Sequence, residues 1–144
     1  MIPVLNAAEL QGYIAEVYPE ILQTYPGFDV ELVEPGRTVT HIVTDERHIR
    51  AGGTVSGPTL FSLADMSGYA CVLSHIGREA LAVTANLNIN FMRKAAPGKL
   101  IAEGRILKLG KLLMTYDCTI TRDGSPDVIA HATGTYAIPP KRIG

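Results

Sequence analysis

The chain has 144 residues, of which 47% are hydrophobic, so it is long enough for one domain with a substantial buried core. Its 13 basic and 14 acidic side chains are scattered and give a net charge of −1, which argues against nucleic acid or an anionic membrane as the main partner. Two cysteines, Cys71 and Cys118, are too few for a disulfide framework or a cysteine metal site. We expect a single domain over residues 1–144, no metal, no membrane segment and a cytoplasmic location.

The first 26 residues are expected to form a peripheral helical segment. Apolar residues recur at helical spacing from Ala7 to Leu22, Asn6 can cap this helix, and Pro19 predicts a break or a kink. The period then changes to two, which predicts two strands at about residues 28–32 and 38–44.

A long apolar helix is predicted over residues 56–74. Ser56 can act as its N-cap, and Pro58 suits a first helical turn. The stretch is apolar or small on every side, so it should be buried on every side. Its one charged residue, Asp65, lies beyond the turn where the helix dipole acts. A carboxylate there needs a partner, such as Arg50, or a chemical role, such as that of a general base.

Four further strands are predicted, with alternating patterns at residues 81–91, 100–106, 112–120 and 128–138. In the first of them the odd positions are apolar and are expected to face the core, so an unbroken alternation would turn Thr84 away from it. One buried helix among antiparallel strands predicts an α+β fold, with the sheet wrapped around one long central helix. Such a sheet leaves an edge to cover, which predicts a homo-oligomer.

The start of the central helix is a second candidate site. The first N–H groups of a helix have no intrahelical partners, so that of Gly57 could bind a carbonyl oxygen that gains negative charge. Alternatively, the glycine only permits a tight entry into the helix. Gly57 and Asp65 together would supply an electrophile-binding end and a base about two turns further on.

Two segments carry a family resemblance. Residues 48–58 form the pattern H-x-R-x-x-G-x-x-S-G-P, with Asp65 nine residues after Ser56, and residues 82–91 form A-V-T-x-x-L-x-I-x-F. These segments resemble the hotdog-fold acyl-CoA thioesterases of the phenylacetate-pathway (PaaI-like) type. In that family the first pattern is H-x-N-x-x-G-x-x-H-G-G, followed by an acid at the same spacing.

The resemblance implies a hotdog fold and the hydrolysis of an acyl-CoA thioester, with coenzyme A as part of the substrate and no separate cofactor. Asp65 would act as general base or nucleophile, and the Gly57 N–H would hold the thioester carbonyl. Thr84 would help to position the acid or the water. The site would lie between the subunits of a homodimer or of a dimer of dimers.

The chain departs from the family pattern at Arg50, which replaces an asparagine, and at residues 56–58. An arginine cannot accept a hydrogen bond, but it could pair with Asp65 or with a substrate carboxylate or phosphate. Ser56 fits an N-cap better than a nucleophile, because no histidine and acid relay is apparent beside it. The residues predicted to bind substrate are His48, Arg50, Ser56, Arg93 and Lys94, of which the last two could meet coenzyme A phosphates.

The sequence therefore predicts an acyl-CoA thioesterase. The alternative is a non-catalytic hotdog protein that binds an acyl-CoA or another small ligand, because the asparagine and the second histidine of the family are replaced. A hotdog hydratase fits less well, since no paired histidine and acid has the spacing of that family.

Overall fold

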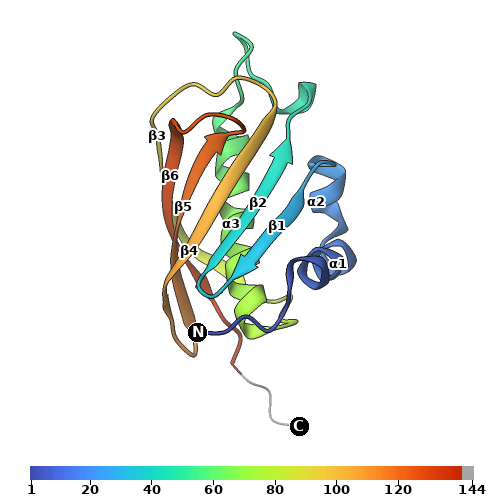
Figure 1. The fold of residues 1–144 in the computed structure, drawn as a ribbon, viewed down its shortest axis with the longest axis vertical. Helices are drawn as coiled ribbons and strands as arrows, with labels where there is room; N and C mark the ends of the chain where they lie inside the picture. The colour runs from blue at the N-terminus through green and yellow to red at the C-terminus, as the bar shows by residue number, and fades with distance from the viewer. Residues whose placement is uncertain (141–144) are drawn as a thin grey trace.

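The computed structural model describes residues 1–140, which form a six-stranded antiparallel sheet curved around one long helix (Figure 1). The strand order is β1-β2-β4-β5-β6-β3. The elements are α1 (Ala7–Val17), α2 (Pro19–Thr24), β1 (Asp29–Glu34), β2 (Arg37–Val43), a 3-10 turn (Glu46–His48), α3 (Gly57–Ile76), β3 (Val83–Phe91), β4 (Lys99–Leu109), β5 (Leu113–Arg122) and β6 (Val128–Ala137). The predicted α+β architecture is confirmed. No helix among residues 1–140 is long and apolar enough to cross a membrane.

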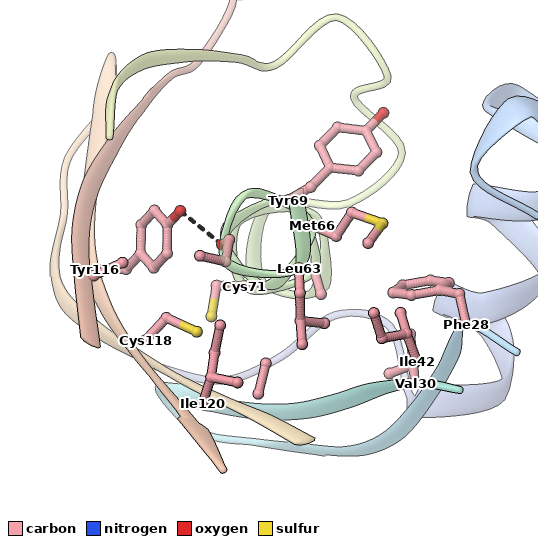
Figure 2. Packing of buried hydrophobic residues seen from close by; sticks show 14 of the residues in the cluster. Phe28, Val30, Ile42, Leu63, Met66, Tyr69, Cys71, Tyr116, Cys118 and Ile120 are labelled. Atoms are coloured by element: carbon pink, nitrogen blue, oxygen red, sulfur yellow. Dashed lines mark hydrogen bonds between the residues drawn. The ribbon is translucent and has the colours of Figure 1, made fainter. Parts of the chain in front are cut away.

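From Leu63 to His75 every residue of the central helix α3 except Asp65 is buried, as its composition predicts, whereas Pro58 and Phe61 near the helix start are exposed. Figure 2 shows side chains that surround it, with Tyr116, Cys118 and Ile120 on one side and Phe28, Val30 and Ile42 on another. The Tyr116 hydroxyl donates a hydrogen bond of 3.0 Å to the Ala64 carbonyl. A Cβ atom at Gly68 would lie 2.3 Å from the Tyr116 ring, so this close contact between α3 and β5 requires glycine.

The N-terminal segment consists of two helices that lie beside β1 (Figure 1). Asn6 caps α1, and the side chains of Leu10 and Ile14 form its buried inner face. The predicted break at Pro19 is confirmed, because Tyr18 ends α1 and Pro19 begins α2. Proline lacks the N–H that would continue α1, yet it is well suited to the first position of a new helix.

The prediction that the odd-numbered face of β3 is core is wrong for the single chain. Val83 and Phe91 are 58% and 54% exposed, whereas Leu87 and Ile89 are only partly buried against the core. The reason is that β3 is an edge strand, paired with β6 alone among residues 1–140. An alternating pattern shows that one face is apolar but does not show what covers it.

Candidate active site

The Asp65 carboxylate is held by two hydroxyl groups from the far edge of the sheet. Its Oδ1 atom accepts hydrogen bonds from Thr84 Oγ1 at 2.5 Å and from Tyr136 Oη at 2.8 Å. Its Oδ2 atom accepts none from residues 1–140. One oxygen therefore fixes the orientation of the carboxylate, while the other is free to take a proton or to attack carbon.

Thr84 reaches Asp65 because β3 is irregular at that point. The register between β3 and β6 shifts between Thr84 and Asn86, which marks a bulge. A bulge adds one residue to a strand and turns the neighbouring side chains, so the simple alternation fails here. The bulge is the physical reason that Thr84 can meet the acid, although alternation alone turns it away.

Tyr136 is a site residue that sequence reasoning missed, since its position in β6 reads as part of the apolar face. It is buried, and its hydroxyl lies within 2.8 Å of both the carboxylate and the backbone carbonyl of Asp65. Burial is the main cause that raises the pKa of the Tyr136 hydroxyl above its usual value, so this group stays protonated and acts as a donor. The tyrosine itself is the signal that could have found this residue, because a buried tyrosine hydroxyl usually needs a hydrogen-bond partner.

Gly57 is the first residue of α3 and provides a free donor. Ser56 precedes it as N-cap and accepts a hydrogen bond of 3.3 Å from the Thr59 N–H through its own Oγ. No hydrogen bond within residues 1–140 uses the Gly57 N–H, and Pro58 has no N–H at all. The Gly57 N–H is thus the available backbone donor at the positive end of the longest helix.

Gly57 lines a cavity of about 420 Å³ between the start of α3 and the end of β3. One wall comes from residues 50–60 and the other from residues 91–95, and the two are joined by a hydrogen bond of 2.9 Å from the Val55 N–H to the Ala95 carbonyl. The lining includes the cations Arg50, Arg93 and Lys94 and no carboxylate. The cavity is therefore suited to an anionic ligand.

Arg50 lies in this cavity wall with its backbone fixed and its side chain exposed. The Arg50 N–H donates to the Thr54 carbonyl at 2.8 Å, and its carbonyl accepts from the Gly53 N–H at 3.1 Å. Among residues 1–140, no carboxylate oxygen lies within 4.0 Å of its guanidinium group, so a single chain does not form the considered pair with Asp65. Its charge is available to a ligand.

His48 lines neither of the cavities that contain Gly57 and Asp65. The ring is 2% exposed, its Nδ1 accepts from the Asp45 N–H at 2.9 Å, and its Nε2 faces the Thr24 carbonyl at 2.8 Å. It stacks on Tyr25 with ring centroids 4.9 Å apart. The His48 carbonyl accepts the Ser56 N–H at 2.8 Å, so His48 supports the loop that leads into α3.

Asp65 lines a different cavity, of about 220 Å³, between α2 and α3. Its lining is largely aromatic and apolar and comprises Tyr18, Glu20, Ile21, Thr24, Tyr25, Phe61, Ser62, Asp65, Met66 and Tyr69. The segment that we expected to be peripheral thus supplies half of this wall. Within residues 1–140, no group of three or more histidine, cysteine or acidic side chains could hold a metal ion.

One chain does not bring Asp65 and Gly57 together. They lie eight residues apart on α3, which is about 12 Å along the helix axis, and they line separate cavities. A base and an oxyanion donor must each lie about 3 Å from the reacting groups of one substrate. Each chain therefore carries two candidate half-sites, one at Asp65 and one at Gly57.

The family model that matches this chain is the Thioesterase superfamily, over residues 52–129. A candidate esterase of Saccharolobus solfataricus is 28% identical over 96% of this chain and 89% of its own length. Among solved structures, a candidate thioesterase from Silicibacter sp. TM1040 is 44% identical, with a TM-score of 0.87 over 97% of this chain and 96% of its own.

Two more distant solved structures are informative in different ways. A candidate thioesterase related to phenylacetic acid degradation, from Ralstonia eutropha, is 22% identical and has a TM-score of 0.77, over 88% of this chain and 98% of its own. It shows the common fold. A Streptococcus mutans protein was solved with bound acetyl-CoA, and it is 25% identical with a TM-score of 0.70 over 81% of this chain and 91% of its own.

Proposed function

This chain belongs to the Thioesterase superfamily and has the hotdog fold, and we propose that it hydrolyses an acyl-CoA thioester to the free acid and coenzyme A. The observation that carries the proposal is the state of Asp65. The carboxylate is anchored through Oδ1, free at Oδ2, and open to a cavity. A purely structural acid would have both oxygens satisfied or face bulk solvent.

The chemistry follows from the two half-sites. Asp65 Oδ2 takes a proton from water as the water oxygen attacks the thioester carbon, or it attacks that carbon itself to form an anhydride that water then cleaves. In either route the carbonyl oxygen gains negative charge, and the Gly57 N–H stabilises it. In the first route the C–S bond then breaks, and the coenzyme A thiolate leaves and takes up the proton held on Oδ2. In the second route the C–S bond breaks as the anhydride forms, and the thiolate receives its proton from the water that cleaves the anhydride.

Both half-sites act on one substrate if two copies pair across a two-fold axis. Antiparallel α3 helices would place Asp65 of one subunit opposite Gly57 of the other. The exposed apolar side chains of Val83 and Phe91, together with the open edge of β3, support pairing at this face. The assembly would be a homodimer or a dimer of dimers, with each active site at the interface.

Charge supports coenzyme A as the carrier. The cavity at Gly57 holds Arg50, Arg93 and Lys94, which suit the phosphates of coenzyme A, and a relative of this chain binds acetyl-CoA. Neither His48 nor Ser56 lies against this cavity, so we assign them the support of the Gly57 loop rather than substrate contact. The two free, buried cysteines agree with a reducing cytoplasmic location.

The test is release of free thiol from a panel of acyl-CoA thioesters, read with a thiol-reactive dye. The protein's own thiols should not interfere, because Cys71 and Cys118 are fully buried and burial raises the pKa of each to about 12. We expect turnover of at least one thioester by the wild-type protein. Tight binding of acyl-CoA without turnover would contradict the proposal and would favour a binding protein on the same fold.

A further inference from the structure

Two neighbouring cavities, one lined by Asp65 and the other by the residues that hold it, share a wall of two tyrosines. The cavity that contains Asp65 has a volume of about 220 Å³. A neighbouring cavity of about 240 Å³ contains Thr84 and Tyr136, the two residues that hold the carboxylate. Tyr18 and Tyr69 line both. Their rings meet edge to face, with centroids 6.5 Å apart, and form the partition between the cavities.

The two halves of this partition are held in different ways. Tyr69 is buried on α3, and its hydroxyl donates a hydrogen bond of 3.0 Å to the Ala80 carbonyl. Tyr18 is 47% exposed, and no hydrogen bond within residues 1–140 uses its hydroxyl. The Tyr18 ring therefore acts through its shape alone, and removing it should cost little stability.

The backbone of Tyr18 is nevertheless fixed, because it sits at the break between α1 and α2. Its N–H donates to the Ile14 carbonyl at 2.8 Å, and its carbonyl accepts from the Ile21 N–H at 3.1 Å. Pro19 enforces the break. The family match starts at residue 52, so this wall comes from a part of the chain outside the matched region.

The lining of the Asp65 cavity suits an uncharged acyl group. It contains four aromatic side chains together with Ile21 and Met66, and its only charged groups, Glu20 and Asp65, are both acidic. The cavity at Gly57 contains three cations and no acid. In a thioester bound between the two ends, charge complementarity directs coenzyme A toward the cations and the acyl group toward the tyrosines.

We propose that Tyr18 sets the acyl-chain length that this site accepts, with short and medium uncharged acyl groups as the preferred class; this rests on the thioesterase function proposed above. An acyl chain that enters beside Asp65 ends against the Tyr18 and Tyr69 rings. Loss of the Tyr18 ring joins the two cavities and roughly doubles the space open to the chain. Each further methylene that becomes buried then strengthens binding about fourfold.

The experiment compares kcat/KM for saturated acyl-CoA thioesters from butyryl- to myristoyl-CoA in the wild-type protein, Tyr18→Ala and Tyr18→Phe. In Tyr18→Ala we expect the ratio of kcat/KM for lauroyl-CoA to that for hexanoyl-CoA to rise more than about tenfold. Tyr18→Phe keeps the ring and should keep the wild-type order of preference. Tyr18→Val provides a second small side chain should the alanine variant fold poorly.

An equal loss at every chain length in Tyr18→Ala and Tyr18→Val would overturn the proposal, because it would indicate general support of the site. An unchanged profile would overturn it as well. If the wild-type protein releases no thiol, the proposed thioesterase function is wrong, and the role of Tyr18 is then tested by ligand binding alone. The probes are then the thioethers S-hexyl-CoA and S-dodecyl-CoA, measured by calorimetry. If Tyr18→Ala does not increase the affinity for S-dodecyl-CoA relative to S-hexyl-CoA, Tyr18 does not set the accepted chain length.

Discussion

The two ends of the candidate site sit on the same helix but differ in almost every physical respect. Asp65 lies in the middle of α3, is oriented by the side-chain hydroxyls of Thr84 and Tyr136, and opens to an aromatic cavity. Gly57 lies at the helix start, offers a backbone N–H that makes no hydrogen bond within residues 1–140, and opens to a cationic cavity. In the proposed mechanism one end supplies a base and the other stabilises an anion.

This difference suggests why the two functions are kept apart in a single chain. An anion-stabilising N–H close to Asp65 would be occupied by the carboxylate itself. About 12 Å of helix separates them in one chain, and in the proposed dimer the substrate would lie between Asp65 of one subunit and Gly57 of the other. The predictions below separate the contributions of the two ends, beginning with the largest effect.

Removal of the Asp65 charge should have the largest effect on turnover. Asp65→Asn keeps the shape and the acceptor atom for Thr84 and Tyr136 but loses the base, so we expect kcat to fall by about 10²- to 10⁴-fold. Thiol release measures the loss. Circular dichroism and gel filtration serve as controls and should match the wild-type protein. A fully active variant would remove Asp65 from the mechanism.

Removal of the Gly57 N–H should be nearly as severe. Gly57→Pro deletes this donor, and Ser56 already has the extended conformation that precedes proline (φ −71°, ψ 150°). We expect kcat to fall by about 10²- to 10³-fold. Gly57→Ala is the matched control: it keeps the N–H, and its Cβ would lie 3.6 Å from the Phe91 ring, which is an ordinary contact. Equal activity of both variants would exclude the oxyanion role.

The hydroxyls that hold Asp65 should matter less than the groups that react. Thr84→Val and Tyr136→Phe each remove one hydrogen bond to Oδ1 and leave the other, so the carboxylate is less well oriented. We expect kcat to fall by about tenfold in each variant, with KM little changed. Steady-state kinetics separate the two parameters. A rise in KM alone would make these hydroxyls substrate contacts.

The cationic end should show a binding effect rather than a chemical one. Arg50→Gln and Lys94→Gln each remove one charge from the Gly57 cavity, so we expect KM for acyl-CoA to rise by up to about tenfold at low salt. The corresponding acyl-pantetheine thioester lacks the nucleotide, and its KM should not change. An equal effect of Arg50→Gln on both substrates would place Arg50 at the thioester instead.

Much of the fold could be predicted from the sequence, because local patterns determine it. The apolar stretch predicted as a helix at 56–74 is observed as Gly57–Ile76, and the alternating segments correspond to the observed strands. Ser56 is the N-cap, as its side chain predicts. Asp65 stood out as a single charge on an apolar helix, a contrast that composition alone reveals.

The rest depended on contacts between distant segments. The bulge that turns Thr84 toward Asp65 appears only in the pairing of β3 with β6, and Tyr136 meets the carboxylate across 71 residues of chain. The exposure of Val83 depends on the place of β3 at the sheet edge. Tyr18 lies in a segment whose pattern predicts a helix but gives no sign of the cavity it lines.

The most direct test of the central claim, that each active site combines Asp65 of one subunit with Gly57 of another, is complementation between two inactive variants. Asp65→Asn and Gly57→Pro chains are co-expressed with different tags, and the mixed dimers are counted by native mass spectrometry. With random mixing about half of the dimers are mixed, and each mixed dimer has one intact site of two. A shared site therefore predicts that thiol release recovers to about a quarter of the wild-type value. Mixed dimers that form but remain inactive would contradict the claim.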